Sequence, residues 1–152
     1  MIVAANTTDR MLAAKGILRN QAGVVPTPDL QALMWVNPTT TEIEWVVGFD
    51  GFVGKCCQMH VVNLSGSPTP RKYLWACFDY PFNQAGMEFV TGIVNSNNKE
   101  AMRFDKHLGF TELARLPGAH DEGGDLVVMK MHKSECRWLK LGKRYETELL
   151  AA

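Results

Sequence analysis

The chain has 152 residues, 46% of them hydrophobic, with 16 basic and 16 acidic side chains and a formal net charge of zero. This length and apolar content predict a single domain over residues 1–152, with a core that needs no disulfide or metal to hold it. A neutral chain has no overall positive field, so a nucleic acid partner is not expected. No apolar run approaches the length of a membrane span, which predicts no membrane partner and a cytoplasmic protein.

The cysteines lie in apolar or mixed sequence surroundings and form no regular framework, so reduced thiols are predicted. They are Cys56, Cys57, Cys77 and Cys136. Together with His60 and His132 they raise a zinc hypothesis. Adjacent cysteines rarely bind one tetrahedral ion, however, and the paired C-x-x-C spacing is missing, so the sequence predicts no metal site.

The N-terminal half predicts one helix followed by three antiparallel strands. Residues 9–20 carry apolar side chains at helical spacing and follow threonines that can cap a helix. Residues 29–37 and 42–50 are apolar runs joined by the polar "PTTT", which indicates a β-hairpin. Residues 52–64 follow the glycine-bracketed turn "GFDG" and predict a third strand.

The C-terminal half predicts a crossover helix at residues 71–86, bent or shortened by Pro81. The nearly all-apolar residues 87–94 indicate a central strand, parallel to the strand before the crossover. Residues 98–109 predict an amphipathic helix that ends at Gly109. The chain closes with a hairpin made by residues 110–118 and 125–133.

The order αβββαβαββ, with N-x-x-A and L-G-F in "NNKEAMRFDKHLGF", resembles the GNAT superfamily of acetyl-CoA-dependent N-acetyltransferases. The block from "MEFVTGIV" to "GGDLVVMKM" is similar to its ribosomal-protein-like branch, and "FDYPFNQAG" and "ECRWL" are similar to GNAT proteins of phages and prophages. The resemblance implies an α/β (α+β) fold with a mixed central sheet. Its N-terminal strands would be antiparallel, one parallel crossover pair would splay for acetyl-CoA, and helices would cover both faces.

The resemblance also implies how the cosubstrate acetyl-CoA binds. In the superfamily the pantetheine arm lies between the splayed strands and pairs with exposed backbone like an added strand. The diphosphate is held by backbone N–H groups at the start of the crossover helix. The residues that this implies here as cofactor-binding are Met59, Val61, Val62, Asn63, Ser67, Thr69, Arg71, Lys72 and Asn98.

The diphosphate loop "SGSPTPRK" departs from the family pattern R/Q-x-x-G-x-G/A. Pro68 and Pro70 each remove a backbone donor. Hydroxyl groups of the loop and the cations of Arg71 and Lys72 are the predicted replacements. Asn98 has two predicted roles, as the N-cap of its helix and, by the resemblance, as a contact to the pantetheine arm.

Acetyl transfer to an amine requires an uncharged amine, so a side chain that titrates near neutrality is useful as a base. His60 lies in the strand expected at the splay and is the predicted base, oriented by Gln58 or Asn63. The alternative is a histidine whose ring is satisfied by a backbone carbonyl. A backbone N–H near Val61 or Val62 would hold the oxyanion.

In the resembled superfamily a tyrosine often protonates the leaving thiolate, but Asp105 stands at that position here. Tyr80 or a water molecule is the predicted replacement, with bulk solvent as the remaining alternative. Asp105 and Lys106 are interpreted as part of a solvated helix face.

The leading hypothesis is an enzyme that moves an acetyl group from acetyl-CoA to an amine by direct transfer in a ternary complex. The acceptor would be a protein N-terminus, a lysine or a small amine. The alternative is a non-catalytic GNAT-fold protein that binds CoA or a regulatory partner, of viral origin and then located in the host cytoplasm. A homodimer is left open.

Overall fold

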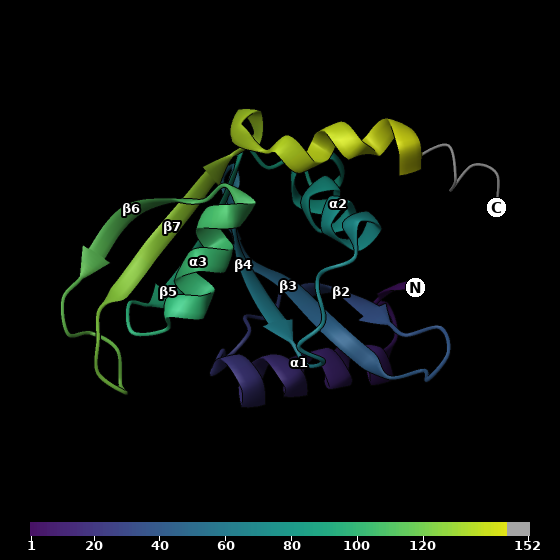
Figure 1. Cartoon of the computed structure of the whole chain (residues 1–152), viewed down its shortest axis with the longest axis horizontal. Coiled ribbons are helices and arrows are strands. Elements are labelled where there is room, and N and C mark those ends of the chain that lie inside the picture. Colours follow the sequence, from purple (N-terminus) through teal and green to yellow (C-terminus); the bar gives the residue numbers. More distant parts are fainter. Residues whose placement is uncertain (146–152) are drawn as a thin grey trace.

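The computed structural model describes residues 1–145 and builds them around one sheet (Figure 1). The strands are β1 (Ile2–Ala4), β2 (Gln31–Val36), β3 (Ile43–Val53), β4 (Cys56–Asn63), β5 (Phe89–Asn95), β6 (Thr111–Leu116) and β7 (Leu126–His132). The helices are α1 (Thr8–Ala22), α2 (Arg71–Asp79) and α3 (Lys99–Leu108), with a π-helical turn η1 (Tyr80–Gln84) and 3₁₀ turns η2 (Lys133–Glu135) and η3 (Arg137–Leu141).

The sheet is mixed, and its strand order is β1-β2-β3-β4-β5-β7-β6. Neighbouring strands are antiparallel except for β4 and β5, which are parallel. This confirms the predicted fold class. The short strand β1 was not predicted, because three residues are too few to carry a periodic pattern.

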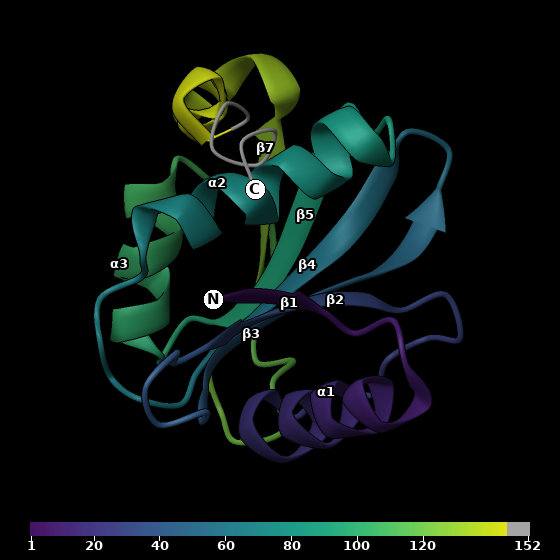
Figure 2. The same cartoon turned by 90° about the vertical axis from the view of Figure 1, so that its right-hand side faces the viewer.

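Helices cover both faces of the sheet, α1 on one side and α2 and α3 on the other (Figure 2). The alternation of side chains along β3 builds both cores. Val46 packs with Leu18 in the cluster on the α1 side. Val47 and Phe49 pack with Phe78 in the cluster on the α2 side.

The β3–β4 hairpin turns later than its sequence suggests. "GFDG" was predicted to be the turn, and this is wrong, because β3 continues to Val53 and the chain reverses at Gly54 and Lys55. Gly51, with a φ of 58°, lies instead where the register with β4 shifts between Asp50 and Val53. Gly51 therefore lies in a β-bulge, and Gly54 supplies the positive φ of the turn.

The predicted helix 71–86 is shortened at Pro81, as expected. The α-helix ends at Asp79, and the chain continues as the π-helical turn η1, in which the Ala85 N–H donates to the Tyr80 carbonyl at 2.8 Å. Proline lacks the N–H that an α-helix would need at this point. The change of helix type redirects the side chains that follow α2.

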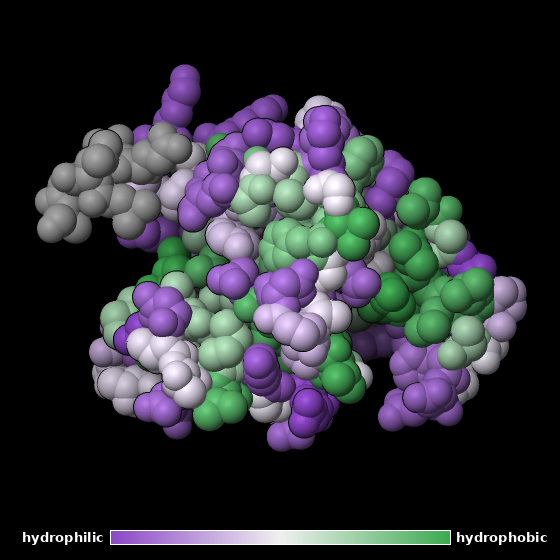
Figure 3. All heavy atoms as spheres, turned by 180° about the vertical axis from the view of Figure 1, so that it is seen from behind, coloured by the Kyte–Doolittle hydropathy of each residue, from purple (hydrophilic) through white to green (hydrophobic). Residues whose placement is uncertain are grey.

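The outer face of β5, β7 and β6 lies beyond the reach of α1, which contacts β2, β3 and β4. Phe89, Ile93 and Leu116 are exposed there. Figure 3 shows apolar side chains gathered on this side of the molecule.

We predict that Leu18→Ala lowers the free energy of unfolding by about 2–5 kcal/mol, since Leu18 is fully buried and its removal leaves a cavity. Leu12→Ala is the matched control, because Leu12 lies on the same helix with 63% of its surface exposed, and it should cost about 0.5 kcal/mol or less. Urea unfolding of both variants measures the difference. Equal losses would contradict the packing of α1 on the sheet.

Candidate active site

The parallel strands β4 and β5 separate soon after they meet. They pair over the first three residues of each, from Cys56 with Phe89 to Gln58 with Thr91. Both strands then continue, β4 to Asn63 and β5 to Asn95. The rest of β4 therefore borders a gap in the sheet.

The backbone of β4 presents alternate residues to this gap. The Leu64 N–H donates to the Glu44 carbonyl at 2.8 Å, so by the alternation of a strand Val62 and His60 also face β3. Met59, Val61 and Asn63 then direct their N–H and C=O groups toward β5. A β-carbon on Gly92 of β5 would lie 3.7 Å from the Met59 carbonyl oxygen, which agrees with this direction. These backbone groups form an edge to which an extended ligand can pair.

Val62 differs from the other predicted binding residues of β4. Its side chain is buried in the core on the α1 side, and its backbone faces β3. Of the two residues predicted to hold an oxyanion, only Val61 faces the gap. The sequence could not separate them, because the direction depends on which pairs of the β3–β4 ladder are hydrogen-bonded.

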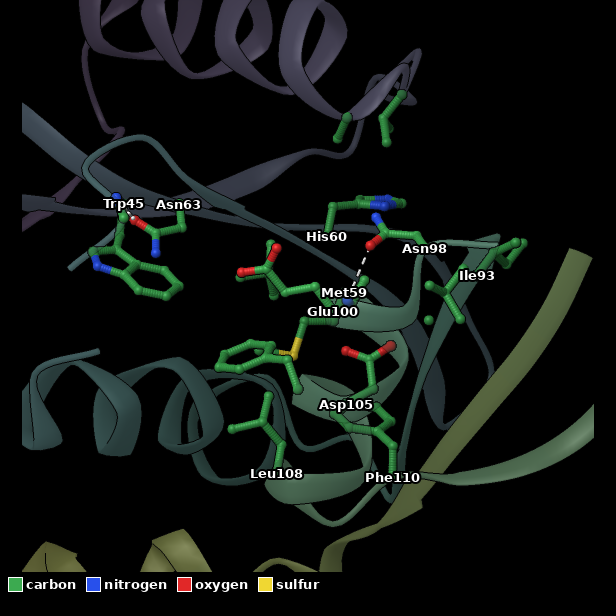
Figure 4. A pocket seen from close by; sticks show the side chains of 18 residues that line it. Trp45, Met59, His60, Asn63, Ile93, Asn98, Glu100, Asp105, Leu108 and Phe110 are labelled. Atoms are coloured by element: carbon green, nitrogen blue, oxygen red, sulfur yellow. Dashed lines mark hydrogen bonds between the residues drawn. The ribbon is translucent and has the colours of Figure 1, made fainter. Parts of the chain in front are cut away.

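A cavity of about 410 Å³ passes through the gap and reaches both faces of the sheet. On the α1 side it is lined by Ala22, Val24 and His60. On the other side it is lined by residues of α3, among them Phe104 and Asp105. Figure 4 shows His60 on the side of α1 and Asp105 on the side of α3.

His60 is held by a carboxylate that was not predicted. Its Nε2 lies 2.6 Å from Oδ1 of Asp50, and the other oxygen of Asp50 accepts the Thr27 N–H at 2.9 Å. Asp50 is buried, with 3% of its surface exposed. Because a carboxylate accepts, Nε2 carries the proton in the neutral ring, and Nδ1 has the free lone pair. His60 can therefore take up a proton at Nδ1.

Asp50 was overlooked because "GFDG" was interpreted as a turn. Within the longer β3, Asp50 pairs with Gln58, two positions from His60, and so lies on the same face of the sheet. The partner of His60 is thus Asp50 rather than Gln58 or Asn63. The Asn63 side chain instead organises the following loop, since its Oδ1 accepts the Gly66 N–H at 3.0 Å and its Nδ2 donates to the Ser67 carbonyl at 3.2 Å.

The loop before α2 leads to a second cavity of about 540 Å³. Thr69 and Arg71 line it from the loop and the start of α2, and Arg137 lines it from η3. Phe104 and Leu108 line both cavities, so the two adjoin. The N-cap of α2 is Pro70, whose side chain makes no cap hydrogen bond, so the cavity lies beside a helix N-terminus without a side-chain cap from this residue. Basic side chains beside a helix N-terminus suit an anion.

Ser67 and Lys72, which were also predicted to bind the diphosphate, are not among the described residues that line the second cavity. Ser67 is exposed in the loop, and its N–H donates to Ser65 Oγ at 3.1 Å. Burial lowers the pKa of the Met1 amine, and the nearby charges of Glu44 and Lys72 act on it as well. Lys72 is thus close to the N-terminus. Arg137 was not predicted, and only its charge beside an aromatic residue in "ECRWL" marked it.

The structure does not bring Tyr80 to either cavity. The π-helical turn sets its ring against Phe49, with 5.1 Å between ring centroids. Burial raises its pKa, with a further contribution from Cys57. Among the described residues that line the two cavities, Tyr80 is absent.

Asp105 lies in the cavity wall, so its interpretation as part of a solvated face is wrong. Asn98, Ala101, Asp105 and Leu108 all line the first cavity and follow the helical spacing of three and four residues. Burial raises the pKa of the Asp105 carboxyl to about 6. The same spacing, extended from Ala101 to Leu108, would have placed Asp105 on the inner face.

Asn98 caps α3 as predicted, because its Oδ1 accepts the Ala101 N–H at 3.1 Å. Its side chain also lines the first cavity. Asn98 can therefore contact a ligand without leaving its capping position, and that contact stays a prediction.

The four cysteines form no disulfide, and burial raises the pKa of the Cys57 thiol to about 12. Within residues 1–145 no group of three or more His, Cys, Asp or Glu side chains is placed to hold a metal ion. Over the same residues no helix has the length and apolar character to cross a membrane.

A mixed sheet whose parallel pair opens around a cavity is the architecture of the GNAT acetyltransferases, and solved structures agree. SpeG spermidine N-acetyltransferase from Vibrio cholerae, itself a GNAT protein, is similar in several structures. A point mutant matches with a TM-score of 0.62 and 16% identity over 86% of this chain and 74% of that chain. A second mutant matches with a TM-score of 0.64 and 13% identity over 88% of this chain and 78% of that chain.

A dodecameric structure of the same Vibrio cholerae enzyme, in an intermediate state, gives a TM-score of 0.62 and 16% identity over 82% of this chain and 72% of that chain. No protein-family model matches the chain, and no curated protein sequence matches it. At these identities the likeness establishes the GNAT fold.

We predict that Asp105→Asn stabilises the protein at pH 8 but not at pH 4. Burial raises the folded-state pKa above the ordinary value of 3.8, so the stability contributed by Asp105 is present at low pH and is lost as pH rises from about 4 through about 6. The gain at pH 8 is at most about 3 kcal/mol, and less because water reaches part of the carboxyl.

Urea unfolding at pH 4, 6 and 8 measures this difference. Asp121→Asn, the same change at an exposed position, is the control and should show no such trend. A difference between wild type and Asp105→Asn that is independent of pH would contradict the burial of the carboxyl.

Proposed function

We propose that the protein is an N-acetyltransferase that moves the acetyl group of acetyl-CoA directly to an amine within a ternary complex. The observation that carries the proposal is the cavity through the β4–β5 gap, which joins a free backbone edge to the Asp50–His60 pair. The GNAT fold shared with spermidine N-acetyltransferases supports an amine as the acceptor.

The residues fit acetyl-CoA along its length. The amides of the pantetheine arm can pair with the backbone edge of Met59, Val61 and Asn63. The diphosphate fits the second cavity, where Arg71 and Arg137 supply positive charge and the N-terminus of α2 favours an anion. With the arm and the diphosphate held in this way, the thioester would lie in the gap between the two faces of the sheet.

The chemistry follows from this position. The amine nitrogen attacks the thioester carbonyl from the α1 side, and Nδ1 of His60 accepts the proton that the nitrogen loses. Asp50 keeps the ring in the tautomer that leaves Nδ1 free and stabilises the imidazolium that forms. The N–H of Val61 can hold the carbonyl oxygen as negative charge develops on it.

The charge of the first cavity favours a cationic acceptor. Glu100 and Asp105 line it, and among the described residues that do so there is no lysine or arginine. A carboxylate-bearing cavity attracts ammonium groups. A small polyamine is therefore the first acceptor to test, followed by a peptide lysine or N-terminus.

Calorimetric titration with acetyl-CoA tests the proposal. Micromolar binding is expected, with desulfo-CoA as the control for the thiol, and mass spectrometry should detect transfer of acetyl to spermidine. Arg71→Ala should raise the Kd by about tenfold through the lost charge-assisted hydrogen bond. Arg19→Ala, an exposed arginine of α1, is the matched control. No binding at millimolar acetyl-CoA would contradict the proposal and favour a non-catalytic protein that binds a regulatory partner.

His60→Ala should lower kcat by about 100-fold or more, because the amine loses its base. The Kd for acetyl-CoA should stay within about threefold, since the ring lies on the α1 side. Asp50→Asn should lower kcat without adding to the loss when combined with His60→Ala, because Asp50 acts through His60. Steady-state kinetics of the two single variants and the double variant measure this. Additive losses would show that Asp50 and His60 act independently.

A further inference from the structure

We infer that Asp105 is the general acid of the proposed reaction, and that its carboxyl gives a proton to the sulfur that leaves when the acetyl group is transferred. The inference rests on the proposed function and adds a second proton-transfer group to it.

The position of Asp105 is the first argument. Its side chain lines the first cavity between Ala101 and Leu108 on the inner face of α3. Figure 4 shows the carboxyl pointing from α3 into the cavity. Within residues 1–145 it has no hydrogen-bond or ion-pair partner, so nothing described there competes for its proton.

The second argument is the side of the sheet on which Asp105 lies. The basic second cavity adjoins the first through Phe104 and Leu108, so the CoA portion reaches the gap from the α3 side. The sulfur belongs to that portion and leaves toward it. Asp105 lines that side of the gap, whereas His60 lines the opposite side, from which the amine arrives.

The acidity of the carboxyl suits the transfer. Burial raises the pKa of Asp105 to about 6, so about a tenth of the molecules carry the proton at pH 7. An alkyl thiol has a pKa of about 8.5, so the transfer to a thiolate is downhill. Of the described cavity residues, the other titratable groups are His60 on β4 and Glu100 on α3. Glu100 is exposed, so water solvates its carboxyl.

The step balances with these groups alone. The bond between the amine nitrogen and the carbonyl carbon forms, and the proton of the nitrogen passes to His60. The carbon–sulfur bond breaks, its electron pair stays on sulfur, and sulfur takes the proton of Asp105. His60 then returns its proton to water, and Asp105 regains one from water.

The test compares Asp105→Asn with wild type on acetyl-CoA and on its selenoester analogue, in which selenium replaces the leaving sulfur. A selenolate is a weaker base than a thiolate and leaves without a proton. With acetyl-CoA, Asp105→Asn should lower kcat by about 100-fold. With the selenoester the loss should shrink to less than about tenfold, and the Kd for acetyl-CoA should be unchanged. Asp105→Ala is measured in parallel as a second variant that cannot donate a proton.

The control is Glu42→Gln, an exposed carboxyl between β2 and β3, which should leave both rates unchanged. If Asp105→Asn lowers kcat equally with acetyl-CoA and with the selenoester, the role of Asp105 is overturned, and the same holds if the variant raises only the KM for the amine. A wild-type protein that transfers acetyl from neither compound would overturn the proposed function, and the role of Asp105 with it.

Discussion

The divergence of β4 from β5 is the constraint on which the rest of the structure depends. A paired strand satisfies its own backbone, whereas the edge from Met59 to Asn63 leaves donors and acceptors that need a partner. The two parts of the sheet remain stable because each has its own support. The β3–β4 hairpin is packed on α1, and β5 is paired along its whole length with β7. The opening is therefore held by structure on both sides.

This arrangement also separates charges that would otherwise interact. Asp50 and His60 belong to the α1 face, and Asp105 belongs to the α3 face. The sheet between them lets one carboxyl accept hydrogen bonds in a buried network while the other is desolvated without a partner. Burial accordingly raises the pKa of the Asp105 carboxyl, whereas Asp50 serves as the hydrogen-bond acceptor of His60.

The fold was largely predictable, because the elements that carry it are long and periodic. The amphipathic pattern of α3, with its Asn98 cap and the glycine that ends it, is an example. The parallel pair also followed, since a crossover helix lies between its strands. The strand β1 could not be predicted from three residues, and no periodicity indicates that a helix will continue as a π-helical turn at Tyr80.

The candidate site was harder to predict, because it depends on the directions in which side chains and backbone hydrogen-bonding groups point. His60 was predicted from its residue type and its place in β4, and it lines the first cavity, but Asp50 required the true length of β3 and the bulge after it. Val61 and Val62 are the same residue type in neighbouring positions, and they differ only in whether their backbone groups face β3 or the gap. Asp105 is the opposite case. Its helical spacing from Ala101 and Leu108 indicates the inner face of α3, but its charged neighbours in "RFDKH" led to the prediction of a solvated face.

The free edge of β4 has a consequence for how such proteins change over time. Main-chain atoms bind in the same way whatever side chain they carry, so the positions that would hold the arm can vary widely without loss of binding. Recognisable motifs should therefore fade from this region long before the activity does. The opposite holds for Asp50 and His60, whose proposed roles need their side chains, so that one substitution would stop the proposed chemistry and leave the scaffold for another use.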